Sequence, residues 1–160
     1  MGRFVPIGIE HYKRMVDDDY YYVDKTLLIK EIMDSSTQVS LFTRPRRFGK
    51  TLAMSMLRTF FEDERDVDGN KIDNRHYFEG KKIEACGGGY LEKQGKYPVV
   101  SLTLKSAKQG TYELAYDNLK DSISEEFRRH RYVCADGVLQ EDEIQKFKSI
   151  IAGSAKEADY

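Results

Sequence analysis

Three adjacent residues, Gly49, Lys50 and Thr51, have the side chains and the spacing best suited to chemistry in this chain. A lysine ammonium binds phosphate oxygens, and a threonine hydroxyl can ligate a magnesium ion. The free amides at a helix N-terminus also attract an anion, because they point outward at the positive end of the helix dipole. We therefore expect a phosphate site here if a helix begins at these residues.

The flanking residues predict such a helix. Val39, Leu41 and Phe42 form a short apolar run, which is typical of a strand covered on both faces, as in a parallel sheet. From Leu52 to Phe61 the apolar residues recur at helical spacing. Residues 38–61 are therefore predicted to form a buried strand, a turn and an amphipathic helix.

The turn, RPRRFGKT, is here called the basic loop, and it departs in one respect from the P-loop pattern G-x-x-x-x-G-K-[ST]. Arg44 occupies the first glycine position, and Pro45 biases it toward extended backbone. An arginine can hold phosphate oxygens through two parallel hydrogen bonds, which a lysine cannot do. The expected phosphate-binding residues are Arg44, Pro45, Arg46, Arg47, Phe48, Gly49, Lys50 and Thr51, with the Thr51 hydroxyl also holding Mg²⁺.

An alternative interpretation gives the basic loop no ligand. A GKT sequence can follow a basic turn by chance, and the arginines would then pair with acidic neighbours such as Asp17, Asp18 and Asp19. The GKT alone is a weak signal, but the predicted order of strand, turn and helix favours phosphate binding.

Three segments together resemble the AAA-ATPase-like family of bacterial proteins: VPIGIEHYKRM, YYYVDKTLLIKEI and VSLFTRPRRFGKTLAMSML. The likeness is weaker through KYPVVSLTLKSAKQGTYELAYDNLKDSISEEF. It implies a P-loop domain that uses ATP and Mg²⁺, with Gly49, Lys50 and Thr51 as the loop glycine, the phosphate lysine and the magnesium hydroxyl. Many members carry a nuclease-like domain after the ATPase part, so nucleic acid is an implied partner of the longer protein.

Composition narrows the function classes. The chain has 160 residues, which is enough for one domain, and its net charge of −1 gives no general attraction to nucleic acid. The two cysteines, Cys86 and Cys134, form no CxxC pair and predict neither a disulfide framework nor a zinc site. No stretch has the length and hydrophobicity of a membrane span or a secretion signal, so a cytoplasmic location is expected.

The expected fold class is α/β, a P-loop NTPase-type parallel sheet with flanking helices that is incomplete in this chain. We expect one N-terminal portion of an AAA-ATPase-like domain, made of a lead-in (1–37), the segment with the basic loop (38–61) and a second core strand with two helices (97–153). The second strand is predicted at 97–104, and helices are predicted at 10–16, 24–34, 111–131 and 142–152.

A working P-loop ATPase also needs an apolar strand that ends in Asp, often followed by Glu, to hold magnesium and orient water. The strand predicted at 97–104 ends in Lys105, and no other apolar run ends suitably. The catalytic residues are therefore unassigned, and this acidic strand is expected downstream, so the fragment alone would be inactive as a hydrolase. The alternative function is a non-catalytic module in which Arg44, Arg46 and Arg47 bind nucleic-acid phosphates.

Overall fold

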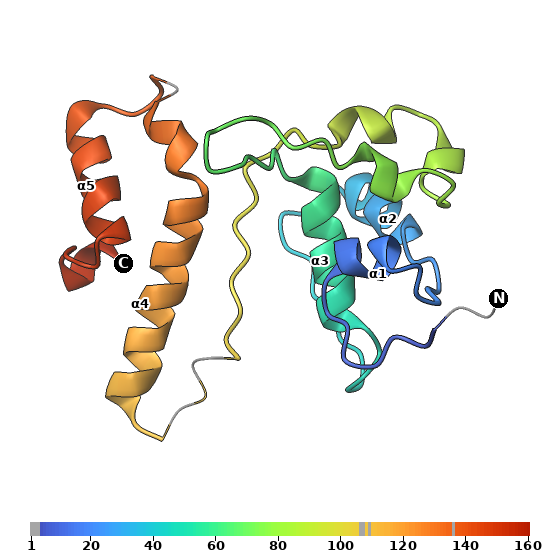
Figure 1. Cartoon of the computed structure of the whole chain (residues 1–160), viewed down its shortest axis with the longest axis horizontal. Helices are drawn as coiled ribbons and strands as arrows, with labels where there is room; N and C mark the ends of the chain where they lie inside the picture. Colours follow the sequence, from blue (N-terminus) through green and yellow to red (C-terminus); the bar gives the residue numbers. More distant parts are fainter. Residues whose placement is uncertain (1–3, 106–107, 109, 136) are drawn as a thin grey trace. The chain divides into compact units, whose positions relative to one another are not determined.

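The fold is described from a computed structural model, which covers residues 4–105, 108, 110–135 and 137–160. Five α-helices follow one another in the described residues (Figure 1): α1 Tyr12–Asp17, α2 Leu27–Ser35, α3 Lys50–Phe61, α4 Tyr112–Arg129 and α5 Glu141–Ile151. Short 3-10 helices connect them: η1 Arg75–Phe78, η2 Glu84–Cys86, η3 Tyr90–Lys93, η4 Arg131–Cys134 and η5 Glu157–Asp159. The predicted helices are confirmed, with ends that differ by a few residues.

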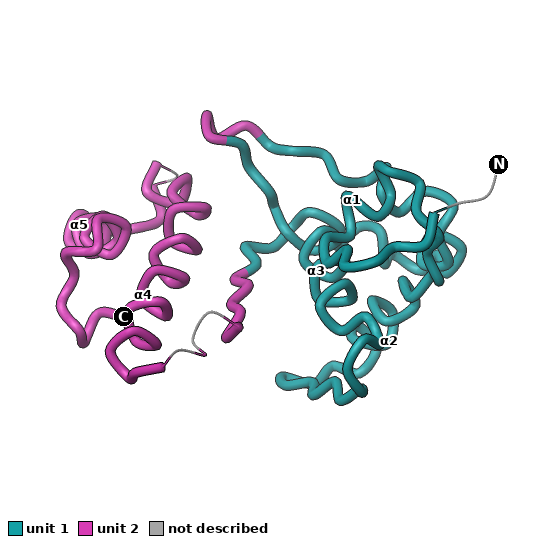
Figure 2. The backbone as a smooth tube through the Cα atoms, turned by 60° about the horizontal axis from the view of Figure 1, so that its bottom comes forward, with its two compact units in different colours: residues 1–66, 71–99 teal, residues 67–70, 100–160 magenta. Residues whose placement is uncertain are grey.

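The chain divides into two compact units (Figure 2). The first comprises Met1–Asp66 and Lys71–Val99, and the second comprises Val67–Asn70 and Val100–Tyr160. The helices α1, α2 and α3 belong to the first unit, and α4 and α5 to the second. The basic loop therefore belongs entirely to the first unit.

An aromatic cluster forms the core of the first unit. The ring of Tyr12 lies 5.5 Å from that of Tyr22 and 5.3 Å from that of Phe78, centroid to centroid. Phe60, from α3, packs edge-on against Phe78 at 5.0 Å. The Tyr12 hydroxyl donates to the backbone carbonyl of Tyr77 at 3.0 Å, so the buried phenol keeps a polar partner. This cluster joins α1 and α3 to the segment around η1.

In the second unit α4 packs against α5. The rings of Phe127 and Phe147 lie 4.8 Å apart, and the buried Ser124 hydroxyl donates to the carbonyl of Ile150 at 2.8 Å. Two residues define helix ends in this unit. Thr111 is the N-cap of α4, and Gly153, at a φ of 69°, follows the C-terminus of α5 in the left-handed conformation.

The predicted parallel sheet is wrong. Among the described residues there is no β-strand, and the bridges are two isolated ones, Glu62 with Tyr97 and Arg65 with Lys71. Residues 38–43 form no regular secondary structure and take part in no β-bridge, and 86% of the surface of Leu41 is exposed. The expected strand 97–104 is divided between the two units.

The predicted strands are absent because an apolar run indicates only that its side chains favour burial, and not that the segment forms a strand. A strand also needs a neighbouring backbone that exchanges hydrogen bonds along its length. Among the described residues, no β-bridge involves residues 38–43, and the segment 97–104 has a single isolated bridge, between Tyr97 and Glu62. The architecture seen is helical, not α/β.

A second correction concerns the start of α2. The helix predicted at 24–34 begins later, at Leu27, and Thr26 is its N-cap. The Asp24 carboxylate instead accepts hydrogen bonds from the Thr26 amide at 2.8 Å and the Thr26 hydroxyl at 2.7 Å. These hydrogen bonds fix the backbone of Lys25, which lies between the two residues.

Within the part of the chain described, no helix combines the length and hydrophobicity needed to cross a membrane.

Candidate functional site

The basic loop leads directly into the first turn of α3. Lys50 is the first residue of this helix, Thr51 is the second, and Gly49 is the N-cap, at a φ of 74°. The Gly49 carbonyl accepts a hydrogen bond from the Ala53 amide at 2.9 Å, which begins the helical pattern. Gly49, Lys50 and Thr51 thus lie at a helix N-terminus as predicted, although an irregular segment without β-bridges takes the place of the strand before them.

Two residues of the basic loop have a left-handed backbone conformation. Gly49 adopts this conformation without steric cost, whereas Arg47 does so with a φ of 67° despite its side chain. A non-glycine residue in this region carries roughly 1–2 kcal/mol of strain. Such strain is often found where a backbone is shaped for a ligand. Arg47 was expected as a phosphate ligand, and its backbone role was not foreseen.

The ammonium of Lys50 is folded back across the loop. Its Nζ donates to the backbone carbonyl of Arg44 and, at 3.0 Å, to that of Pro45. Both partners are neutral, and a phosphate oxygen would form stronger, charge-assisted hydrogen bonds with the same ammonium. The loop therefore wraps around a cation that can exchange carbonyl partners for an anion.

A cavity of about 590 Å³ adjoins the loop within the first unit. Its volume falls in the range of roughly 300–1,000 Å³ that is typical of small-molecule sites. Polar and charged side chains line part of it, and the rest is lined by apolar residues of α2, of α3, of the basic loop and of the segment before the loop. The lining residues are Lys25, Glu31, Ser40, Arg44, Lys50 and Gly49 together with Leu27, Leu28, Phe42, Phe48, Ala53, Met54 and Leu57.

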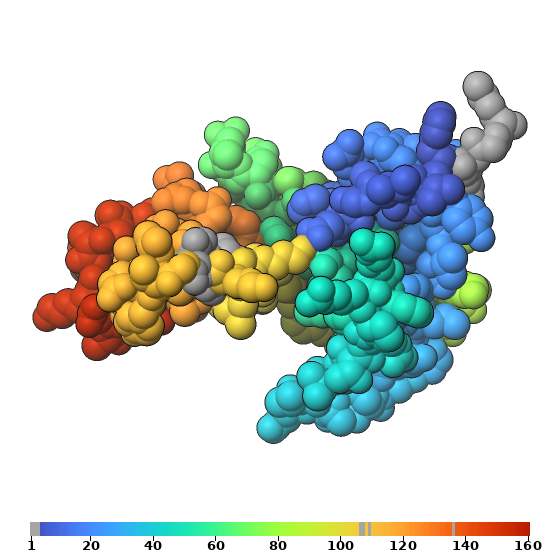
Figure 3. All heavy atoms as spheres, turned by 90° about the horizontal axis from the view of Figure 1, so that it is seen from below, coloured from blue at the N-terminus to red at the C-terminus, as the bar shows by residue number. Residues whose placement is uncertain are grey.

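The structure brings four of the eight expected residues to this cavity and leaves four outside its lining. Arg44, Phe48, Gly49 and Lys50 line it. Thr51 is exposed at the start of α3, and the other three are exposed on the loop: Pro45, Arg46 and Arg47. Figure 3 shows the chain that leads from α2 into the basic loop and α3, coloured light blue to turquoise, at the surface of the first unit.

The acidic neighbours proposed for the arginines are engaged elsewhere. Asp17 accepts a hydrogen bond from the Tyr77 hydroxyl at 3.2 Å, and Asp18 pairs with Arg14 at 3.2 Å. The guanidinium of Arg44 donates to the carbonyl of Thr43 at 3.0 Å. The alternative without a ligand therefore lacks the expected pairing for two of its three aspartates.

Sequence reasoning missed Lys25. Its Nζ donates to the Phe48 carbonyl at 3.0 Å, so this lysine reaches the basic loop from the segment before α2. The residue lies within the YYYVDKTLLIKEI segment, but a contact across 23 positions cannot be derived from local spacing. The sequence therefore placed Lys25 in a segment that resembles the family, but it gave no sign that this lysine contacts the basic loop.

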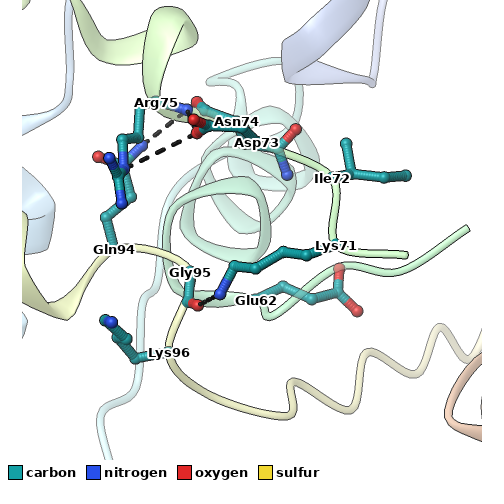
Figure 4. A pocket seen from close by; sticks show the side chains of 9 residues that line it. All are labelled: Glu62, Lys71, Ile72, Asp73, Asn74, Arg75, Gln94, Gly95 and Lys96. Carbon is teal, nitrogen blue, oxygen red and sulfur yellow. Dashed lines mark hydrogen bonds and ion pairs between the residues drawn. The ribbon is translucent and has the colours of Figure 1, made fainter. Parts of the chain in front are cut away.

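A second, smaller cavity of about 230 Å³ lies near η1 and η3 (Figure 4). Its polar groups mostly bind one another. Lys71 donates to the Gly95 carbonyl at 2.6 Å, and Gln94 donates to the Asn74 carbonyl at 3.2 Å. Lys71 also pairs with Asp63 at 2.7 Å. The described residues contain no group of three or more His, Cys, Asp or Glu side chains placed to hold a metal ion.

Comparison with known proteins adds a family to this geometry. The family described as Predicted AAA-ATPase matches residues 6–159. An uncharacterized protein in the vnfD 5′ region of Azotobacter chroococcum mcd 1 is 43% identical over 58 residues, which is 36% of this chain and 11% of that protein's length. No solved structure matches the chain. Because the family match extends over almost all of its residues, the chain belongs to the family of predicted AAA-ATPases.

Proposed function

We propose that this chain binds Mg·ATP at the basic loop. The observation that supports this best is that the Lys50 ammonium and the N-terminus of α3 lie together beside the cavity of about 590 Å³. Membership of a family of predicted AAA-ATPases supports the same ligand. The proposal concerns binding, since no catalytic carboxylate is assigned.

In this proposal the phosphates lie against the backbone amides of the first turn of α3, which have no helical partner. The Lys50 ammonium exchanges the carbonyls of Arg44 and Pro45 for phosphate oxygens. Thr51 supplies a hydroxyl to the magnesium ion, and Arg44 adds a guanidinium at the cavity lining. The apolar walls suit the uncharged part of the nucleotide.

The direct test is Mg·ATP binding to the Lys50→Ala variant, measured by isothermal titration calorimetry. Removing a charged hydrogen-bond donor should weaken binding by about 10- to 100-fold. Lys93→Ala is the matched control, because Lys93 is an exposed lysine of the same unit outside the cavity. If Lys50→Ala and the unmodified chain bind Mg·ATP equally, the proposal is wrong.

A second candidate function is binding of nucleic-acid phosphates by the loop arginines. It is favoured by one observation, that Arg46 and Arg47 are exposed and lie outside the cavity lining. This function requires binding of a single-stranded oligonucleotide that weakens steeply with salt and is lost in the Arg46→Gln, Arg47→Gln double variant. ATP should then neither bind nor compete. Where an acidic strand of the kind a P-loop ATPase needs accompanies this chain, we extend the first proposal to ATP hydrolysis.

A further inference from the structure

The second lysine at the basic loop, Lys25, has a position that the proposed function does not yet use. Its Nζ donates to the Phe48 carbonyl at 3.0 Å and would lie 3.2 Å from a Cβ atom added at Gly49. Lys25 lines the same cavity as Lys50 and Arg44. Three cationic side chains from two separate segments therefore border one cavity.

The neighbours of Lys25 hold its backbone firmly. Asp24 accepts hydrogen bonds from the amide and hydroxyl of Thr26 and, at 2.8 Å, from the amide of Lys82. Thr26 is fully buried, and its hydroxyl oxygen accepts a hydrogen bond from the Ile83 amide at 3.1 Å. The residues on both sides of Lys25 are thus fixed to residues 82–83, while the lysine side chain itself extends to the basic loop.

The charges around the cavity are unbalanced in favour of cations. Lys25, Arg44 and Lys50 line it, and Glu31 is the acidic residue in the lining. Both lysine ammoniums donate to neutral backbone carbonyls. Like charges gathered at one site repel each other, and a multiply charged anion relieves this repulsion more than a singly charged one.

We propose that Lys25 is a second phosphate-binding lysine of the basic loop and favours a nucleoside polyphosphate over a monophosphate. This inference rests on the proposed function. Lys25 exchanges the Phe48 carbonyl for a phosphate oxygen when the nucleotide binds, as Lys50 exchanges its own two carbonyls. The rigid turn of Asp24 and Thr26 keeps this second cation near Gly49, where it requires only a movement of the side chain.

The test compares Mg·ATP and AMP binding to the full chain by calorimetry. In Lys25→Gln the side-chain amide can still donate to the Phe48 carbonyl, but the charge is gone. ATP affinity should fall about tenfold or more, with a smaller loss for AMP, and Lys25→Arg should recover most of the ATP affinity. A purely structural role of Lys25 would leave the affinity of Lys25→Gln for ATP unchanged. Lys93→Gln is the matched control, and it should bind ATP as the unmodified chain does.

A second measurement needs no variant. An amine-acylating reagent is applied to the unmodified chain with and without Mg·ATP, and labelled lysines are identified by mass spectrometry. Lys25 and Lys50 should both be protected by ATP, whereas Lys93 should not. If Lys50 is protected or required and Lys25 is neither, this inference is overturned and the proposed function stands. If ATP fails to bind, or binds without need of Lys50, both are overturned.

Discussion

Gly49 links the backbone of the basic loop to its two lysines. It precedes Lys50 in the chain, it has a φ of 74°, and the space where its Cβ would lie is 3.2 Å from the Nζ of Lys25. A side chain at this position would therefore strain the backbone and displace a flexible ammonium at the same time. The positive φ of the turn favours glycine here, and an added side chain would also shift the Lys25 ammonium slightly.

We predict that Gly49→Ala lowers the free energy of unfolding by about 1–2 kcal/mol and also weakens Mg·ATP binding. Chemical denaturation and calorimetry measure the two effects. Gly80→Ala is the matched control, because Gly80 has a φ of 68° and open space around its missing Cβ. It should show a similar loss of stability with unchanged ATP affinity. Equal ATP binding by both variants would contradict the role given to Gly49.

At this scale the sequence predicted the local part of the candidate site. The positions of Gly49, Lys50 and Thr51 at a helix start follow from spacing alone, because the apolar period begins directly after them. The position of Lys25 could not be derived, since it depends on how α2 packs near the loop. The left-handed backbone of Arg47 was equally hidden, because arginine gives no signal for positive φ.

Among the helices, α3 connects the core to the candidate site. Met56 and Phe60 are fully buried in the aromatic cluster, whereas Met54, on another face, is 56% exposed and lines the cavity. The helix begins at the basic loop and buries its C-terminal part. Its position, and therefore that of Lys50, depends on the packing of its buried face.

We predict that Phe60→Ala lowers the free energy of unfolding by about 3–5 kcal/mol, because it leaves a cavity among packed rings. Met54→Ala, the control on the exposed face, should change stability by no more than about 1 kcal/mol. Urea denaturation followed by circular dichroism at 222 nm measures both. Similar midpoints for the two variants would mean that Phe60 is not packed as the structure shows.

The elements were predictable where their signal is local. The sequence located the five α-helices of the described residues to within a few residues, because each helix satisfies its backbone within its own segment. The predictions of strands were wrong because the backbone hydrogen bonds of a strand are made with another segment of the chain. The unpaired residues 38–43 have the composition of a strand and lack the partner that would make them one.

For the whole molecule, the carboxylates determine the response to acid. Burial raises the pKa of Glu64, but hydrogen bonds from Lys13 and Asn74 outweigh it and hold this pKa below its ordinary value of 4.5. Burial likewise raises the pKa of Asp24, and the amides of Thr26 and Lys82 reverse the effect to a value below 3.8. A carboxyl with a lowered pKa stabilises the fold above its unfolded pKa and loses this contribution as pH falls through its folded pKa.

We therefore predict that the melting temperature falls as the pH is lowered through and below about 4.5, where these carboxyls begin to take up protons on unfolding. Differential scanning calorimetry across the pH range measures it. Glu64→Gln should melt at a lower temperature at neutral pH and show a flatter acid dependence, because it cannot titrate. If both chains lose stability in parallel, Glu64 does not contribute to acid sensitivity.

The unpaired segments also have a consequence for the whole molecule. Leu41 is 86% exposed in the first unit, and Leu102 is 50% exposed in the second. Backbone without sheet partners and with exposed apolar side chains is a template for pairing with another chain.

We predict that the chain self-associates as its concentration rises, and that the Leu41→Asp, Leu102→Asp double variant reduces this association without lowering the melting temperature. Exposed side chains contribute little to the folded state, and the new charges oppose pairing.

Light scattering coupled to size-exclusion chromatography measures the association. Val67→Asp is the control, since Val67 is 89% exposed in a polar turn and its replacement adds one charge without touching either extended segment. A strictly monomeric chain at every concentration, with a sharp two-state melt, would show that residues 38–43 and 100–104 do not pair with a second chain. Equal reduction by Val67→Asp would instead attribute the association to net charge, because the two extended segments would then have no special role.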